Sequence, residues 1–531
     1  MAVGIERLAA VALAGLLAAA PLASAQSQTP QRGGTVLLTL GGDPPTVNPS
    51  ITTGVPDGIA GCIMYQGLTQ ELYTGEVEPL LAKSWTISPD GKTYNFDLVK
   101  ANWHDGKPFT SADAAYSLVQ VSAKYSPTFS NAGALIDKVE TPAPDKLTIH
   151  LKEPYGPFLL SLACPVGGGI LPKHIFEGTN PLQNPATMAT ATPIGTGAFK
   201  FQEWKRGDHL RFVRNSAYWE PGKPYLDEIV ARIIPQPAAR TQALLAGEID
   251  FISFYFFPSS DEKVVSASPK LKMARSATPA AIDYLFLNML RKPVDDKKVR
   301  QALLMATDRN YLVKTAWLGR GSPGTMPFTN KIEWAADKSI DYDKMYPFDL
   351  AKANAALDAA GFPRKAEGIR FQVHMPYASE EADYVQVAIA LKSMWAAAGV
   401  EVLIEPTERA TFLKRIYTDH DFDVTLNGYG SFNEPALGIA RGFVTSGIGK
   451  PYANVSSYSN KAVDELFRKG ESVTSPEERG VFYKQAQKIL AEDLPVFTLR
   501  EKALDDALST KLHDYLVEAH FGSWRNAWIS Q

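Results

Sequence analysis

The chain has 531 residues, of which 45% are hydrophobic, and this length and composition predict two or more folded lobes rather than wholesale disorder. Its 57 acidic residues slightly outnumber its 54 basic residues, so the chain lacks the basic excess typical of nucleic-acid binders. Cys62 and Cys164 are too few for a disulfide scaffold or a four-thiolate zinc site. Whether these two cysteines bond to each other is left open by the sequence.

The N-terminal segment has the pattern of a secretory signal peptide. Residues 8–22 are apolar and follow Arg7, and Ala23-Ser24-Ala25 forms a small-x-small cleavage site. The alternative is a membrane anchor, but the run is shorter than the ~20 residues that a span needs. We therefore expect residues 1–25 to be a cleaved signal peptide and the mature chain to be a soluble periplasmic protein.

The first half of the mature chain is predicted to consist mainly of strands. Residues 85–87 and 94–98 alternate in polarity around the turn at 88–92, which predicts a hairpin. Thr110 and Asp113 form a capping box at the start of a helix. A short helix is predicted at 238–246, and the other strands are predicted at 35–40, 199–201, 210–213, 229–234 and 249–251. The aromatic run Phe251–Phe257 is predicted to be buried, with the wall of an apolar pocket as the alternative.

From about residue 283 onward, strands and helices alternate. The predicted strands are 371–375, 400–404 and 422–426, and the helices between them are 384–398 and 411–417. This alternation predicts parallel βαβ units, in which ligands bind beyond the carboxyl ends of the strands. The segment Asn427–Pro435 follows the last strand and combines glycines, aromatic rings, amides and a carboxylate. It is the candidate ligand-contacting loop, with an ordinary surface turn as the alternative.

Motifs for catalysis and metal binding are missing from the sequence. It contains no Gly-x-Ser-x-Gly elbow, no His-Glu-x-x-His and no phosphate loop, and its eight histidines are scattered. We therefore predict no catalytic residue, no metal site and no cofactor. A secreted hydrolase with an unrecognised carboxylate site is the alternative from another functional class.

Several segments, in the same order along the chain, carry a resemblance to a known family. The most specific are 81–96, which contains Leu-Ala-Lys-Ser-Trp, and 103–113, which reads Trp-His-Asp-Gly-Lys-Pro-Phe-Thr-Ser-Ala-Asp. The others are 32–35, 43–49, 193–201, 214–219, 245–250 and 288–309. Together they resemble extracellular solute-binding proteins of family 5, which serve peptide and nickel ABC transporters.

The resemblance implies an α/β fold of the bilobal periplasmic-binding-protein type II (cluster C), a clamp with an extra domain. The expected parts are domain I at 31–75, 192–280 and 495–531, the extra domain II at 76–191, and domain III, the second lobe, at 281–494. The chain is expected to cross between the lobes at 278–283 and 493–498.

The implied function is capture of a peptide-like or other small polar solute between two closing lobes, followed by delivery to a membrane ABC permease. We expect a monomer that binds no nucleic acid. A sensor or chaperone that uses the same clamp is a further alternative.

The resemblance also locates the binding site. In peptide-binding relatives, an Asp in this loop pairs with the free amine of the peptide, whereas Ser431 stands at that position here. Nickel-binding relatives have a His where this chain has Ala436. A structural role is expected for Glu434, with ammonium binding as the alternative. The expected ligand-binding residues are Tyr65, Tyr429, Gly430, Ser431, Phe432, Asn433, Glu434 and Arg441. Arg441 and the tyrosines suit an anionic or hydroxylated solute such as an opine, a sugar or a modified peptide.

Overall fold

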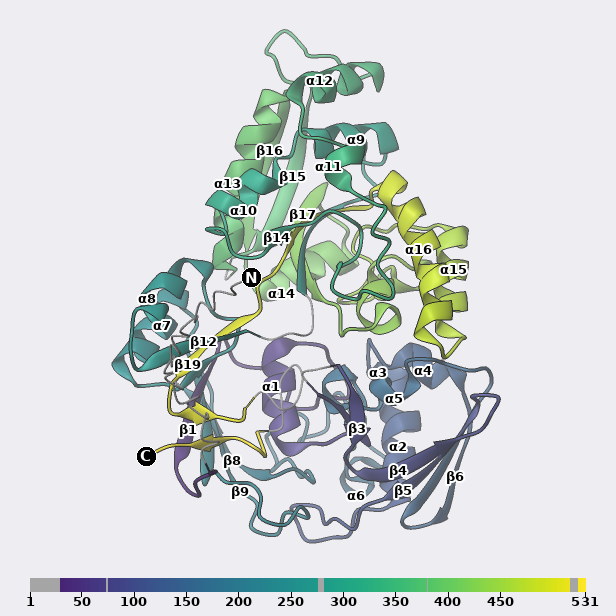
Figure 1. Ribbon diagram of the computed structural model, residues 1–531, viewed down its shortest axis with the longest axis vertical. Helices are drawn as coiled ribbons and strands as arrows, with labels where there is room; N and C mark the ends of the chain where they lie inside the picture. Colours follow the sequence, from purple (N-terminus) through teal and green to yellow (C-terminus); the bar gives the residue numbers. More distant parts are fainter. Residues whose placement is uncertain (1–28, 73–74, 276–280, 380, 516–523) are drawn as a thin grey trace, which may run out of the picture.

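The computed structural model describes residues 29–72, 75–275, 281–379, 381–515 and 524–531. Figure 1 shows domains I and II next to each other below the second lobe. The predicted signal peptide, and with it the expectation of its cleavage, lies outside the described residues.

Domain I is built on a seven-stranded sheet with the order β12-β19-β11-β1-β10-β9-β8. β1 is parallel to its neighbours β10 and β11, and the other pairs are antiparallel. The strands are β1 (Thr35–Leu40), β8 (Phe199–Lys205), β9 (His209–Arg214), β10 (Glu228–Ile233), β11 (Phe251–Ile252), β12 (Leu271–Arg275) and β19 (Asp505–Ser509). The other elements of domain I are α1 (Val55–Met64), α7 (Pro237–Ala246), η3 (Ser259–Asp261), α8 (Glu262–Ser266) and the pair β20 (Leu512–His513) and β21 (Trp528–Ile529).

Domain II contains an antiparallel sheet with the order β4-β5-β7-β6. The predicted hairpin is its β4–β5 pair, and the predicted capping box is present at Thr110 and Asp113. The strands are β4 (Ala82–Ile87), β5 (Thr93–Leu98), β6 (Ile136–Ala143) and β7 (Lys146–Leu151), and β2 (Thr69–Glu71) pairs with β3 (Val77–Pro79) nearby. The helices are α2 (Ser111–Tyr116), η1 (Ser117–Ser122), α3 (Ala123–Tyr125), α4 (Ser130–Leu135), α5 (Phe158–Ser161), η2 (Cys164–Val166) and α6 (Lys173–Phe176).

The second lobe is built on a four-stranded antiparallel sheet, β14-β18-β13-β17, and a parallel pair, β15–β16. The strands are β13 (Ala281–Leu287), β14 (Ser322–Pro323), β15 (Phe371–Ala378), β16 (Val400–Thr407), β17 (Val424–Gly430) and β18 (Val496–Glu501). The helices are α9 (Lys297–Met305), α10 (Arg309–Thr315), α11 (Tyr342–Met345), α12 (Leu350–Ala359), α13 (Ala382–Ala397), α14 (Arg409–Leu413), η4 (Lys414–Thr418), η5 (Pro435–Ile439), η6 (Ala440–Gly442), η7 (Thr445–Gly447), α15 (Lys461–Glu471) and α16 (Pro476–Asp493).

The prediction of consecutive parallel units was correct only for β15, α13 and β16. β17 instead pairs antiparallel with β13, from Val424 opposite Leu287 to Gly430 opposite Ala281. All seven residues of β13 are buried, so this strand needs hydrogen-bonding neighbours on both sides. Asn427–Gly430 were predicted to be loop, but they are the end of β17.

The second crossing between the lobes lies later in the chain than predicted. β18 belongs to the sheet of the second lobe, and β19 belongs to the sheet of domain I. The crossing is therefore at residues 502–504, and domain I resumes at about residue 505 rather than 495. The first crossing, between β12 and β13, lies in 276–280, outside the described residues. The other predicted boundaries remain predictions.

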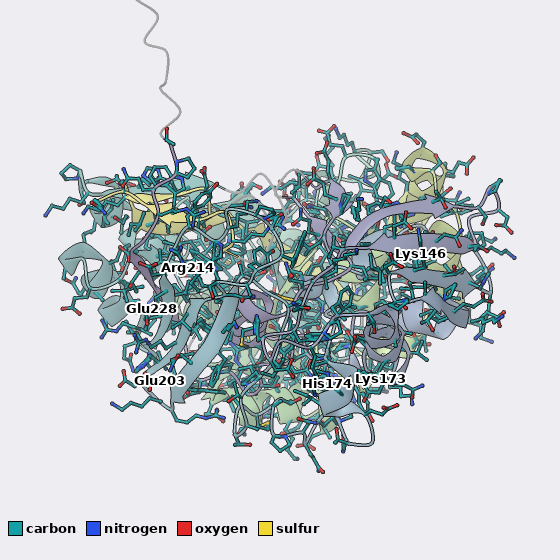
Figure 2. All side chains as sticks on the ribbon, turned by 90° about the horizontal axis from the view of Figure 1, so that it is seen from below. Lys146, Lys173, His174, Glu203, Arg214 and Glu228 are labelled. Carbon is teal, nitrogen blue, oxygen red and sulfur yellow. A yellow bond between two sulfur atoms is a disulfide. The ribbon has the colours of Figure 1, made fainter. Side chains whose placement is uncertain are left out.

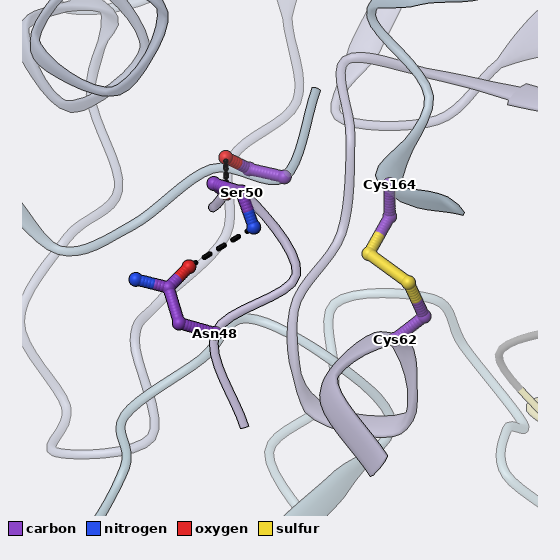
Figure 3. The surroundings of a disulfide bond; sticks show 5 residues. Asn48, Ser50, Cys62 and Cys164 are labelled. Atoms are coloured by element: carbon purple, nitrogen blue, oxygen red, sulfur yellow. Dashed lines mark hydrogen bonds between the residues drawn. A yellow bond between two sulfur atoms is a disulfide. The ribbon is translucent and has the colours of Figure 1, made fainter. Parts of the chain in front are cut away.

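Cys62 and Cys164 form a disulfide that connects domain I to domain II (Figure 3). Cys62 lies in α1 and Cys164 begins η2, and their Cα atoms are 6.0 Å apart. Beside it, the Ser50 hydroxyl donates to the Gly169 carbonyl at 2.7 Å. The bond closes a loop of about 100 residues, which strongly restricts the unfolded chain.

Charged side chains below domains I and II form local pairs of opposite sign rather than a patch of one sign. Arg214 and Glu228 lie on one side of Figure 2 and Lys146 on the other. Arg214 pairs with Asp227 at 2.7 Å, Glu228 pairs with Arg211, and Lys146 pairs with Asp97. At each of these three places a cation is therefore balanced by a neighbouring anion.

Reduction of the disulfide should lower the unfolding midpoint of the mature protein. A disulfide typically contributes about 2–4 kcal/mol, and long loops lie at the upper end. Urea denaturation with and without a thiol-free reductant measures the effect. The Cys62→Ala/Cys164→Ala variant should unfold at the lower midpoint and be insensitive to reductant. An equal midpoint for oxidised and reduced protein would contradict this prediction.

Candidate functional site

The candidate loop leaves β17 at Gly430 and turns sharply. Phe432 and Asn433 both have a φ of 51°, a left-handed conformation that is rare for residues other than glycine. Phe432 packs into the core of domain II together with Leu437. The Asn433 side-chain amide donates to Glu71 of β2 at 2.9 Å. The loop thus belongs to the second lobe but is held against domains I and II.

A buried ion pair between Glu434 of the loop and Arg479 of α16 holds the loop in place. Both carboxylate oxygens of Glu434 accept from the guanidinium of Arg479, and the side chains of Glu434 and Arg479 are 7% and 4% exposed. Glu434 also caps η5 by accepting from the Ala436 amide at 3.0 Å. The carboxylate of Glu434 is therefore occupied by contacts within the second lobe, and pairing with a solute would break them.

Arg441 is half-buried and stacks on the loop. Its guanidinium carbon lies 4.9 Å from the ring centre of Tyr429 and 5.4 Å from that of Phe432. Its Nε donates to the Gly438 carbonyl at 3.2 Å, and in the part of the chain that the structure describes no carboxylate pairs with it. Burial lowers the pKa of Arg441, which reflects the cost of holding this charge without an anion.

Domain I contributes Tyr255, which faces the same region from the segment after β11. A side chain on Gly430 would place its Cβ 3.7 Å from the Tyr255 hydroxyl, so the two lobes approach closely here. Tyr255 is also one of the groups that act electrostatically on Arg441. Phe251 and Phe257 are buried as predicted, whereas residues 254–256 are half-buried, so part of this run forms a wall.

Asp506 holds the segment that carries Tyr255. It accepts from the Phe254 amide at 2.7 Å and from the Tyr515 hydroxyl at 3.1 Å. The side chain is 3% exposed, and burial raises the pKa of this carboxyl to about 7. Tyr255 and Asp506 were not predicted as site residues; the aromatic run was the one signal in the sequence that pointed to this segment.

Another charged cluster lies where the start of β13 meets the end of β18. Asp283 has no exposed surface and accepts from Lys502 at 3.0 Å, from Arg500 Nε at 2.8 Å and from the Tyr384 hydroxyl at 3.0 Å. Burial alone would raise the pKa of Asp283, but the two cations hold it below its usual value. Gly428 lies against this cluster. A Cβ atom added at Gly428 would lie 3.1–3.3 Å from side-chain atoms of Tyr384, Asp283 and Lys502. No pattern in the sequence indicated this cluster, because its members are far apart in the chain.

The remaining predicted residues have different surroundings. Ser431 is buried, and its hydroxyl accepts from the Asn433 amide at 3.4 Å. The Tyr429 hydroxyl donates to the Ala453 carbonyl and lies 2.9 Å from the Tyr417 hydroxyl, so its ring, not its hydroxyl, faces Arg441. Tyr65 is 1% exposed in the hydrophobic core of domain I. Its prediction as a ligand contact is therefore not carried into the proposed site.

Two searches over the described residues gave negative results. No group of three or more His, Cys, Asp or Glu side chains among them could hold a metal ion. Within the same residues, no helix combines the length and apolar character needed to cross a bilayer.

Comparison with known proteins gives consistent matches. The family model for bacterial extracellular solute-binding proteins, family 5, matches residues 76–450. The glutathione-binding protein GsiB of Pectobacterium atrosepticum is 28% identical over 493 residues, covering 90% of this chain and 89% of GsiB. The oligopeptide-binding protein AppA of Bacillus subtilis, solved with a nonapeptide, is 26% identical with a TM-score of 0.85, covering 95% and 100% of the two chains. The Agrobacterium protein AgaA, solved with agropinic acid, is 25% identical with a TM-score of 0.81, covering 94% and 99%.

The buried carboxyl of Asp506 should make stability depend on pH. Its pKa is about 7 in the folded protein and about 3.9 in an unfolded chain, so the folded state holds the proton more tightly. The stability that the protonated Asp506 carboxyl adds to the folded state is fully present below about pH 4. It declines as the pH rises and is lost above about pH 7. Relative to the wild type, Asp506→Asn should gain a few kcal/mol between pH 4 and 8, at about 1.4 kcal/mol per pKa unit.

Urea denaturation across this pH range measures the Asp506 effect. The exposed Asp145→Asn variant is the matched control and should follow the wild type at every pH. A constant difference between Asp506→Asn and the wild type would show that Asp506 ionises normally in the folded protein.

Proposed function

The chain belongs to family 5 of the bacterial extracellular solute-binding proteins and is the solute-binding component of an ABC importer, and we propose that its solute carries a carboxylate and needs no free amine. The observation that carries this proposal is Arg441, a half-buried guanidinium without a carboxylate partner among the described residues. We further propose that the chain acts in the periplasm after removal of residues 1–25, and that it binds its solute without converting it.

Charge balance favours an anionic group at Arg441. A guanidinium presents paired donors that fit a carboxylate, and among the described residues only Nε of Arg441 donates, to the Gly438 carbonyl. The two stacked rings of Tyr429 and Phe432 hold the guanidinium in place and exclude water from one face. A solute carboxylate would therefore find a positioned partner at little conformational cost.

Charge balance disfavours a free ammonium at the loop. The position at which the resemblance predicts an Asp holds Ser431, and the loop's own carboxylate, Glu434, is used by Arg479. Burying an unpaired ammonium costs several kcal/mol. The proposed class therefore includes opines, N-blocked peptides and other carboxylated solutes. AgaA, solved with agropinic acid, is a relative of similar fold that binds a ligand other than a plain peptide.

Solute capture follows from contacts on both sides of the site. Arg441 belongs to the second lobe and Tyr255 belongs to domain I, so a solute between them stabilises the arrangement in which the lobes approach. The closed form is then the state that the membrane permease receives.

Thermal unfolding of the mature protein against matched ligand pairs tests the solute class. The pairs are peptides with free or acetylated N-termini, peptides with free or amidated C-termini, opines, and sugars with or without a carboxylate. A ligand at ~100 times its Kd adds about 2.7 kcal/mol of stability. N-acetylation should preserve the raised midpoint, and amidation should abolish it. Stabilisation that requires a free amine would refute the proposal.

Substitution at Arg441 tests the proposed anchor with the best solute of that panel. Arg441→Gln should weaken binding roughly 10- to 100-fold, since a hydrogen-bonded charge contributes about 1.5–3 kcal/mol. Arg441→Lys keeps the charge but loses the paired donors, so its affinity for the solute should lie between those of the wild type and Arg441→Gln. Arg468→Gln, at an exposed arginine of α15, is the control. Isothermal titration calorimetry gives the three affinities, and an unchanged Kd for Arg441→Gln would place the carboxylate elsewhere.

A further inference from the structure

A hollow lies at the crossing between the lobes, at the opposite edge of the second-lobe sheet from the loop after β17. Its volume is about 790 Å³. Its walls come from residues 260, 262 and 263 of domain I, from residues 314, 318–322 and 331 of the second lobe, and from residues 501–505, which contain the crossing. The sheet order β14-β18-β13-β17 places this hollow beside β14 and β18. Both lobes and the connection between them therefore contribute to one cavity.

Five cationic side chains line the hollow, against three carboxylates. Two of the cations have partners, because Arg320 pairs with Asp505 at 2.7 Å and with Glu262 at 2.8 Å, and Lys502 pairs with Asp283 at 3.0 Å. The third carboxylate, Glu501, accepts from the Asn330 amide at 2.8 Å.

The other three cations are Lys263, Lys314 and Lys331, and within the described ranges none of them forms an ion pair. Lys331 donates to the Lys502 carbonyl at 3.4 Å, whereas no hydrogen bond holds the side chain of Lys263 or Lys314 there. Lys263 lies in α8 of domain I, and Lys314 lies near the end of α10 in the second lobe. Like charges gathered at one cavity repel each other until an anion balances them.

We propose that this hollow binds a small multivalent oxyanion, such as phosphate or a tricarboxylate, between Lys263 of domain I and Lys314 and Lys331 of the second lobe. Lysine ammonium groups act as point charges that suit an anion with several negative oxygens. Of the surrounding carboxylates, Glu262 and Asp505 pair with Arg320, and Glu501 accepts from the Asn330 amide and also attracts Lys331. Lys263 and Lys314 are thus the two cations of the hollow that no described carboxylate of its lining pairs with or is seen to attract.

Occupancy of the hollow should oppose closure on a solute. The hollow and the loop after β17 lie at opposite edges of the same sheet, and the chain crosses between the lobes beside the hollow. An anion that draws Lys263 toward Lys314 brings the lobes together at this edge, which separates them at the other. This coupling rests on the proposed clamp function, whereas anion binding itself does not. By linkage, solute would weaken anion binding by the same factor.

Isothermal titration of the mature protein with inorganic phosphate and with citrate tests the site at constant ionic strength. Citrate, with more charge, should bind more tightly than phosphate. The Lys263→Gln/Lys314→Gln variant should weaken both at least tenfold. The control variant, Lys270→Gln/Lys450→Gln, removes the same charge from exposed lysines in the same two lobes and should bind as the wild type does. Absence of binding, or equal weakening in both variants, would overturn the proposal. Unfolding midpoints of both variants show whether the fold is kept.

Small-angle X-ray scattering without solute tests the coupling separately. Citrate should increase the radius of gyration of the wild type relative to chloride at equal ionic strength, and should leave that of Lys263→Gln/Lys314→Gln unchanged. An unchanged or smaller radius despite binding would overturn the coupling but keep the site. Lysine-dependent citrate binding combined with a solute panel that stabilises nothing would instead count against the proposed solute class alone.

Discussion

The placement of the two lobes depends on a fully buried carboxylate, Asp283, at the start of β13. A lone ionised carboxylate at this depth would be strongly destabilising, and it is stable here because Arg500 and Lys502 pair with it. Both cations come from the end of β18, just before the chain crosses to domain I. The ion cluster thus ties the entry strand of the second lobe to its exit strand, and the crossing between the lobes starts from a rigid point.

The Asp283 cluster lies between the loop after β17 and the hollow beside β14 and β18. Gly428 of β17 packs on the Asp283 cluster, and two residues later the same strand releases the loop that carries Phe432 and Asn433. On the other side, Lys502 both pairs with Asp283 and lines the hollow beside β14 and β18. A shift of the lobes about residues 502–504 would therefore change the surroundings of both the loop and the hollow, whereas the sheet between them would move as one body.

Two arginines that contact the loop, Arg479 of α16 and Arg441 of η6, have opposite roles because their partners differ. Arg479 is neutralised by Glu434, and this pair fixes the loop in a strained left-handed turn. Arg441 has aromatic rings as neighbours and no carboxylate partner among the described residues, which is why we propose it as the anchor for an incoming group. The ion pair between Glu434 and Arg479 thus stabilises the loop from within the second lobe, whereas the guanidinium of Arg441 lies near Tyr255 of domain I. A charge that is already paired within the protein gains little interaction energy from a ligand, so the two roles need separate arginines.

The sequence by itself determined the features that depend on neighbours along the chain. The β4–β5 hairpin, the capping box of α2 and the position of the candidate loop after a strand all follow from local polarity and turn residues. Contacts between distant residues were decided only by the tertiary structure. These include the antiparallel pairing of β17 with β13, the crossing at 502–504, the Cys62–Cys164 bond and the burial of Tyr65. The sequence could also nominate Arg441, but only the fold showed that no carboxylate among the described residues pairs with it, because charge balance at such a site depends on residues that are far apart in the chain.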